Sequence, residues 1–203
     1  MADSLKKHHR RSIRLKEYDY SQAGGYFITI CIQDSKHIFG RIRDGFVELS
    51  KIGKIANEFW FEIPKHFEDV ELDEFVIMPN HLHGIICIND MDVGVQNFEP
   101  LQKQSRFQHI ITKSIGSIIR AYKSSVTHWC RQNGYEGFRW QRNYWEHVIR
   151  NEEKLYKIRQ YIQNNPLKWH LDRENPKREG TNKLEEEIFK FKRARGPRPH
   201  IRS

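Results

Sequence analysis

Two histidines separated by one residue are the first candidates for chemistry in this sequence. His81 and His83 follow Pro79-Asn80, a pair that favours a tight turn, and apolar runs typical of buried strands flank both. Because side chains alternate across a strand, His81 and His83 point to one face and Leu82 to the other. Two imidazoles on one face suit a divalent metal. Two histidines that are only hydrogen-bonded near a sheet edge would show the same pattern.

Tyr161 is a candidate nucleophile on an expected helix. Asn151 is a favourable N-cap for this helix, Pro166 ends it, and three apolar residues form its buried stripe: Leu155, Ile158 and Ile162. At ~100° per residue, Tyr161 falls ~60° from the centre of that stripe, and Asn165 lies next to it. Such a boundary position fits both a tyrosine at the edge of the core and a catalytic tyrosine.

The rest of the pattern predicts the elements that must position these residues. Strands are expected over 26–32, 70–78, 81–88 and 138–149, with a small hairpin around Asp44-Gly45; helices are expected over 50–63, 109–132 and 151–164. The order β, α, β, β, α, β, followed by a helix, is ferredoxin-like. It predicts an α+β fold with an antiparallel sheet, two helices on one face, and a further C-terminal helix that carries Tyr161.

The positive charge is concentrated in three segments. Of a formal net charge of +9, residues 1–16 hold six Lys/Arg and one acid, and residues 190–202 hold six and none, which leaves a nearly neutral body. Within that body, residues 101–145 hold eight bases and one acid. This distribution predicts a polyanionic partner, although charge runs are more often solvated faces.

Six residues of the basic segment are candidates for nucleic-acid contact. Three cations lie on the polar face of the expected helix, and arginines and an aromatic ring interleave after it: Lys113, Arg120 and Lys123, then Arg139, Trp140 and Arg142. Rings stack on bases and guanidinium groups hold phosphates. An ordinary aromatic edge strand is the alternative for the second group.

Length and composition predict one domain of 18–170 between two charged ends. Residues 1–17 form a basic flexible arm, 89–108 a polar surface loop with the composition of a disordered segment, and 171–203 a charged C-terminal tail. The three cysteines are far apart and are expected to be reduced, buried thiols. Without an apolar run long enough for a membrane span or a signal peptide, we expect a cytoplasmic protein.

Four segments, taken together, resemble the REP-associated tyrosine transposases. They occur in the order of that family, cover roughly residues 18–169, and read VIMPNHLH at 76–83, GSIIRAYKS at 116–124, WQRNYWEHVIRN at 140–151 and YIQNNPLKW at 161–169. The family is related to the single-tyrosine insertion-sequence transposases of the HUH endonuclease superfamily. The two ends of the chain and the loop 89–108 are not covered.

The resemblance implies an activity for the candidates above. Mg²⁺ or Mn²⁺ would be held by His81, His83 and Asn165, and Tyr161 would cleave single-stranded DNA next to stem-loops through a 5′-phosphotyrosine intermediate. The partner would be repetitive extragenic palindrome-like DNA at the nucleoid, and both monomer and homodimer stay open. Two rivals remain. A noncatalytic hairpin-binding protein would not need the intact histidines and tyrosine, and a phosphohydrolase for small phosphate esters would not need the basic ends.

Overall fold

The core of the protein is one antiparallel sheet of four strands, seen in a computed structural model that describes residues 22–89 and 114–189. The strands are β1 (Gly24–Cys31), β4 (Val70–Ile77), β5 (His81–Ile88) and β6 (Trp145–Ile149), in the spatial order β4-β5-β1-β6. The first strand is therefore central, with β5 and β6 as its two partners. This arrangement confirms the predicted α+β class.

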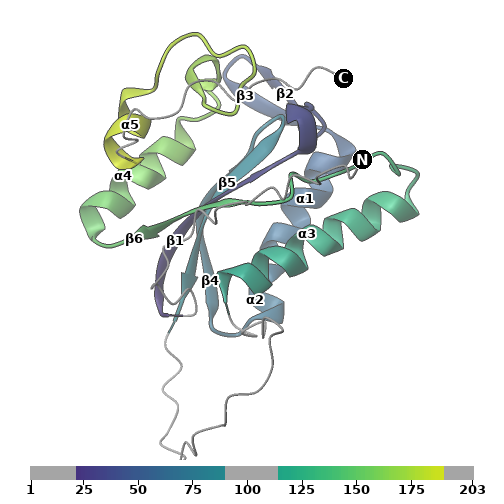
Figure 1. The fold of residues 1–203 in the computed structure, drawn as a ribbon, viewed down its shortest axis with the longest axis horizontal. Coiled ribbons are helices and arrows are strands. Elements are labelled where there is room, and N and C mark those ends of the chain that lie inside the picture. The colour runs from purple at the N-terminus through teal and green to yellow at the C-terminus, as the bar shows by residue number, and fades with distance from the viewer. Residues whose placement is uncertain (1–21, 90–113, 190–203) are drawn as a thin grey trace, which may run out of the picture.

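Helices cover both faces of this sheet (Figure 1). On one side lie α1 (Lys51–Phe61), α2 (Ile63–His66) and α3 (Ile115–Gln132), and on the other α4 (Glu152–Gln163) and α5 (Lys183–Phe189). Alternate residues of β1 explain both layers. Ile28 and Ile30 belong to the core shared with α1 and α3, whereas Phe27 belongs to the core shared with α4 and α5. Both faces being buried accounts for the continuous apolar runs in the sequence.

The local signals for turns and caps act as expected. Strands β2 (Gly40–Arg43) and β3 (Phe46–Leu49) form the predicted hairpin, in which Asp44 and Gly45 both have positive φ, 51° and 79°, as a tight hairpin turn requires. Ser50 caps α1 by accepting a hydrogen bond from the Gly53 amide at 3.1 Å. The helix expected over 50–63 ends at Phe61, and Pro64 lies in the first turn of the short helix α2, where a missing N–H costs nothing.

The segment expected as a strand over 138–149 is shorter, since β6 begins only at Trp145. Before it, Trp140 forms a single bridge with Ile32, and its indole N–H donates to the carbonyl of Lys123 at 3.0 Å. This side-chain bond ties the residues before β6 to α3, while the bridge keeps them beside the end of β1. Figure 1 shows this segment running back along α3 towards β6.

Part of the expected C-terminal tail is folded. After the short helix η2 (Trp169–Leu171), the chain loops over the sheet into α5, whose Ile188 is buried in the core beneath α4. The arm 1–17, residues 90–108 of the expected loop and residues 190–203 lie outside the described residues. No helix within 22–89 or 114–189 is long and apolar enough to cross a membrane.

Candidate active site

The histidine pair on β5 lies inside the protein, on the side of the sheet covered by α4. His81 and His83 are 0% and 3% exposed, and their Nε2 atoms are 3.0 Å apart. Leu82 packs into the opposite core, so the predicted alternation is confirmed. Two ligand atoms ~2.1 Å from one ion and at right angles would be separated by ~3 Å, which is the observed spacing.

Hydrogen bonds on the far side of each ring orient the two Nε2 atoms. Nδ1 of His81 donates to Oδ1 of Asn80 at 2.8 Å, and Nδ1 of His83 lies 2.9 Å from the hydroxyl of Thr29, which can accept its proton. In these tautomers the lone pairs of the two Nε2 atoms face and repel each other, and a cation between them would remove that repulsion. Burial lowers the pKa of His81 to about 3, against the opposing charge of Asp172, so its ring is neutral and able to bind a metal.

Asp172 completes a cluster that could hold a metal ion. Its carboxylate is 1% exposed and lies 3.9 Å from Nε2 of His81 and 3.6 Å from Nε2 of His83. The backbone N–H of Glu174 donates to one carboxylate oxygen at 2.7 Å, and the amide of Asn165 donates to the other at 2.8 Å. Burial alone would raise the pKa of Asp172, but the two imidazoles and the Asn165 amide hold it below its usual range. Two neutral imidazoles and a carboxylate suit a divalent cation.

The hydroxyl of Tyr161 reaches this cluster from α4. It lies 3.3 Å from Nε2 of His83 and 3.5 Å from the carboxylate of Asp172, while the ring packs edge-on against Phe27 and Phe189. Burial, and then the negative charge of Asp172, raise the pKa of Tyr161 well above its ordinary value. The phenol is therefore protonated at neutral pH and needs a nearby cation or base to become a nucleophile.

Asn165 lies where the sequence suggested, one turn beyond Tyr161, and is 1% exposed. Its nitrogen donates to Asp172, while its Oδ1 is buried and has no hydrogen-bond partner within the described parts of the chain. An unpartnered buried oxygen is costly unless a ligand meets it. This oxygen keeps Asn165 a candidate ligand beside Asp172.

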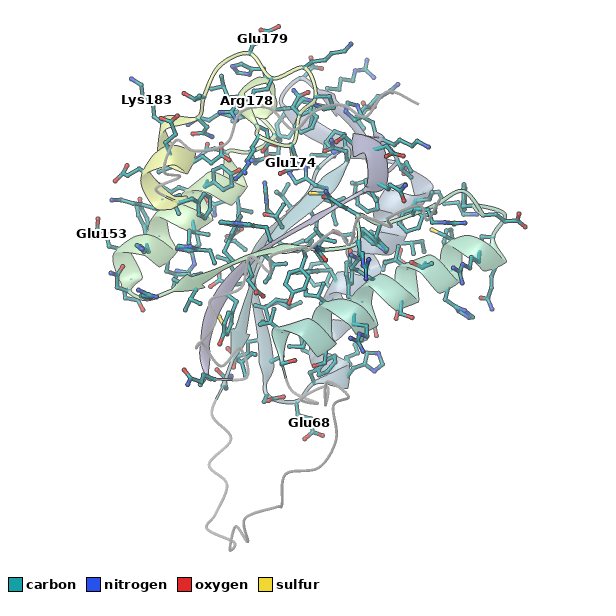
Figure 2. The ribbon with its side chains drawn as sticks, viewed as in Figure 1. Glu68, Glu153, Glu174, Arg178, Glu179 and Lys183 are labelled. Carbon is teal, nitrogen blue, oxygen red and sulfur yellow. The ribbon has the colours of Figure 1, made fainter. Side chains whose placement is uncertain are left out.

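Sequence reasoning missed Asp172, which falls in the segment expected to be a tail. No periodicity marks it, because it lies in a loop between η2 and α5 (Figure 2 shows Glu174, Arg178 and Glu179 in the same loop). One signal was available: Asp172 is the first carboxylate in the sequence after Glu153. Metal sites with imidazole ligands often include such a carboxylate.

Four of the six predicted nucleic-acid residues come together, on the side of the sheet covered by α3. Arg120, Lys123, Trp140 and Arg142 line one groove of about 560 Å³. Burial lowers the pKa of Lys123 to about 8, and its ammonium group donates to the carbonyl of Gln141 at 2.6 Å. The two others do not join them. The guanidinium group of Arg139 turns away to the carbonyls of Glu136 and Phe138, and Lys113 lies outside the described residues.

The side chain of Asn80 should control metal affinity without being a ligand. Its Oδ1 fixes the tautomer of His81, and its Nδ2 donates at 2.8 Å to the carbonyl of Glu174, two residues from Asp172. One amide therefore positions two segments that carry candidate ligands. We expect Asn80→Ala to weaken Mn²⁺ binding by ~10- to 100-fold in a calorimetric titration. Asn89→Ala, which removes a surface amide bonded to Glu71, is the control, and equal affinity in both variants would contradict the role.

Comparisons with known proteins place the chain among relatives. No protein-family model matches it. An uncharacterised protein of Haemophilus influenzae is 47% identical over 167 residues, which span 81% of this chain and 92% of the relative. A second protein of that organism, named "Putative REP-associated tyrosine transposase", is 27% identical over 150 residues, which span 74% of this chain and 74% of the relative. A solved REP-associated tyrosine transposase bound to a REP hairpin has a TM-score of 0.53 and 20% identity, over 77% of this chain and 74% of that one.

The antiparallel sheet with helices on both faces is thus the fold of the REP-associated tyrosine transposases. Sequence identity shows a closer relationship than the shared fold does. The chain belongs to one family with the 47% identical Haemophilus protein, and that family is related to the REP-associated tyrosine transposases. The resemblance drawn from the four sequence segments is confirmed.

Proposed function

We propose that this protein is a metal-dependent transposase that cleaves and rejoins single-stranded DNA next to hairpins, acting at the nucleoid. The observation that carries the proposal is the position of the Tyr161 hydroxyl, 3.3 Å from His83 and 3.5 Å from Asp172. A nucleophile, two imidazoles and a carboxylate meet at one buried point from segments far apart in sequence. Relatives named as transposases support the same class of activity.

The proposed reaction is an in-line displacement at phosphorus. The phenolic oxygen of Tyr161 forms a bond to the scissile phosphate, and the bond from phosphorus to the 3′ oxygen breaks. The phenolic proton is released to solvent, which reaches the site once its cover has shifted, and the departing oxygen takes up a proton from solvent to become a 3′-hydroxyl. The product is a 5′-phosphotyrosine. Because that ester retains the energy of the broken bond, the 3′-hydroxyl can reverse the step and rejoin strands.

The cation would be held by His81, His83 and Asp172, with Oδ1 of Asn165 as a further donor. When bound, Mg²⁺ or Mn²⁺ would supply Lewis-acid polarisation of the phosphate and would favour the ionised phenol, against the burial that raises its pKa. Imidazole nitrogens suit Mn²⁺ better than Mg²⁺, which prefers oxygen ligands. We therefore expect Mn²⁺ to support the reaction at lower concentration.

Access to this site requires movement of the chain that covers it. His81, His83, Tyr161 and Asp172 are each 3% exposed or less. The cover is the segment 174–189, beyond Asp172; the carbonyl of Glu174 accepts a hydrogen bond from Asn80, and Phe189 packs on Tyr161. A DNA phosphate can meet the phenol only after this segment shifts, so cleavage would follow DNA binding by a separate conformational step.

A labelled-strand assay tests the proposal. A single strand with a hairpin, taken from repeats that flank the gene, is incubated with protein and Mn²⁺ and then denatured in SDS. A 3′ label should migrate with the protein, a 5′ label should be released on a shorter strand, and EDTA should abolish both. Cleavage without an adduct would instead indicate a hydrolytic phosphoesterase. Hairpin binding with neither product would indicate the noncatalytic binding protein.

A further inference from the structure

The edge strand β4 contains an irregularity beside the helix that carries Tyr161. Its pairing with β5 shifts register between Leu72 and Phe75, which is the pattern of a β-bulge. The side chains show the same break. Leu72 and Phe75 both pack into the core shared with α1 and α3, although residues three apart on a regular strand point to opposite faces. The strand therefore contains one residue more than regular alternation allows.

This bulge turns two consecutive carboxylates towards α4. Nε of Arg159 donates to Oδ1 of Asp73 at 2.9 Å, and a terminal nitrogen of the same guanidinium group donates to Oδ2, so the ion pair is bidentate. Nε2 of Gln163 donates to Oε1 of Glu74 at 2.8 Å. In a regular strand one of these two acidic neighbours would face away from the helix. Oδ1 of Asp73 also accepts the backbone N–H of Glu74 at 2.6 Å, so one carboxylate holds both the bulge and the helix.

The contacts with β4 and the side chain of Tyr161 lie on opposite flanks of α4. Arg159 and Gln163 are about one turn apart and share one side of the helix, whereas Tyr161 is ~160° around the axis from each. The ring of Tyr161 packs against Phe27 of β1, and its hydroxyl reaches His83 of β5. The helix therefore crosses the sheet with the ion pair at the edge strand and the candidate nucleophile over the central strands.

The apolar stripe of α4 does not by itself set the rotation of the helix. Ile158 and Ile162 make apolar contacts, which have no preferred direction, whereas a bidentate guanidinium–carboxylate pair has a fixed geometry. A roll of ~10° about the helix axis would move an atom ~8 Å from that axis by ~1.4 Å. Misplacing a reacting atom by ~1 Å can cost ~100-fold in rate. The directional contact on the far flank opposes such a roll.

The ion pair is better suited to fixing geometry than to stabilising the fold. The side chains of Asp73 and Arg159 are 17% and 42% exposed, and ion pairs that reach water contribute little to stability. The hydrogen bonds from Arg159 lower the pKa of Asp73 below its ordinary value, against partial burial, so the carboxylate is ionised at neutral pH. The pair is therefore present under the conditions in which the enzyme would act.

We propose that the bulge in β4 is the part of the fold that aims the Tyr161 hydroxyl at the histidine cluster. Asp73 acts through Arg159 as the main contact. Glu74 acts through Gln163, one turn further along the helix. Both acidic residues are positioning residues, because among the contacts described neither touches the cluster or the phenol. The proposal rests on the role of Tyr161 as nucleophile proposed above.

The rate of adduct formation in a single turnover tests this role, with the hairpin strand and Mn²⁺ both saturating. We expect Arg159→Met to lower the rate constant at least ~10-fold, because the helix is then free to roll. Asp73→Asn should lower it equally, and the double variant should be no slower than either single variant, because all three lose the same contact. Arg159→Lys keeps the charge but not the two-point geometry, and should also be slower than wild type.

Affinity measurements separate aiming from general damage. Mn²⁺ affinity and hairpin affinity should stay within about twofold of wild type in Arg159→Met, since the lost contact is far round the helix from the cluster. A circular dichroism melt checks that the variant is folded. Glu153→Gln is the matched control, because it removes an ion pair with Lys157 that lies within α4 and does not reach the sheet. It should form the adduct at the wild-type rate.

A wild-type rate in Arg159→Met would overturn the proposal while leaving Tyr161 as the nucleophile. Additive losses in the double variant would also overturn it, because Asp73 and Arg159 would then act separately. A fall in Mn²⁺ affinity that matches the fall in rate would overturn it as well, and would make the pair a support of the metal site. If the wild-type protein forms no adduct, the proposed function fails and the positioning role fails with it.

Discussion

Tyr161→Phe should form no SDS-resistant adduct with a 3′-labelled hairpin strand in Mn²⁺, a loss on the order of 10⁴-fold or more. The substitution removes only the hydroxyl that faces His83 and Asp172. The phenyl ring keeps its packing against Phe27 and Phe189, so the helix and its surroundings should be unchanged. Band intensity on a denaturing gel measures the effect, and a circular dichroism melt checks that the variant is folded.

Tyr156→Phe is the matched control on the same helix. Tyr156 is 60% exposed, and among the contacts described its hydroxyl accepts a hydrogen bond only from Gln160, at 2.9 Å. Unlike the hydroxyl of Tyr161, it makes no contact with the histidine cluster among those described. We expect it to form the adduct at the wild-type rate. An adduct that persists in Tyr161→Phe would show that another hydroxyl is the nucleophile, and Tyr156 and Tyr144 would be the next residues to replace.

His81→Ala and His83→Ala should each abolish cleavage, and Asp172→Asn should lower Mn²⁺ affinity at least ~100-fold, because each change removes a proposed metal ligand. Calorimetric titration with Mn²⁺ measures the affinity directly. Asp172→Asn is the most informative variant, since it keeps the shape of a buried side chain and leaves no cavity. Hairpin binding should survive in all three, because the cluster would act on the scissile phosphate and not on the stem.

His147→Gln is the control for these variants. His147 lies on β6, on the same side of the sheet, but stacks on Trp145 and is not part of the metal-binding cluster. Burial lowers the pKa of His147 to about 4, so this ring too is neutral. Loss of metal binding in His147→Gln would mean that metal affinity is sensitive to any histidine on this face and is not specific to the cluster. Undiminished Mn²⁺ affinity in a His81→Ala/His83→Ala double variant would show that the pair is structural.

The sequence predicted the structure well where the signal is a repeating pattern of side chains or a contact between residues close in the chain. Alternation along β5 placed His81 and His83 together and Leu82 opposite them, because the period of a strand does not depend on what the strand packs against. Caps at Ser50 and Asn151 set the starts of α1 and α4, because a side-chain bond to a free amide is made within one turn. The expected roles of Tyr161 and Asn165 remain predictions.

What sequence reasoning could not supply depends on contacts between distant segments. Asp172 joins the histidines through Asn165 and Glu174, in a loop whose path follows no repeating pattern. Arg139 and Arg142 look equivalent in the sequence, yet only Arg142 lines the groove, because the indole of Trp140 is bonded to α3 and sets which way its neighbours face. Alternation identifies two faces but does not say what lies against each.

The position of β1 in the sheet has a consequence for how the chain folds. This strand is made first, yet Gly25 pairs with Ile149, with most of the described chain between them. Its other partner, β5, is also reached only after the hairpin and two helices. Pairings this distant in sequence must overcome a large loss of chain entropy before they form, so folding should be slow for a domain of this size. During synthesis the edge of β1 that will receive β6 stays open until residue 149 has emerged, and β1 is then an apolar strand edge available to other chains.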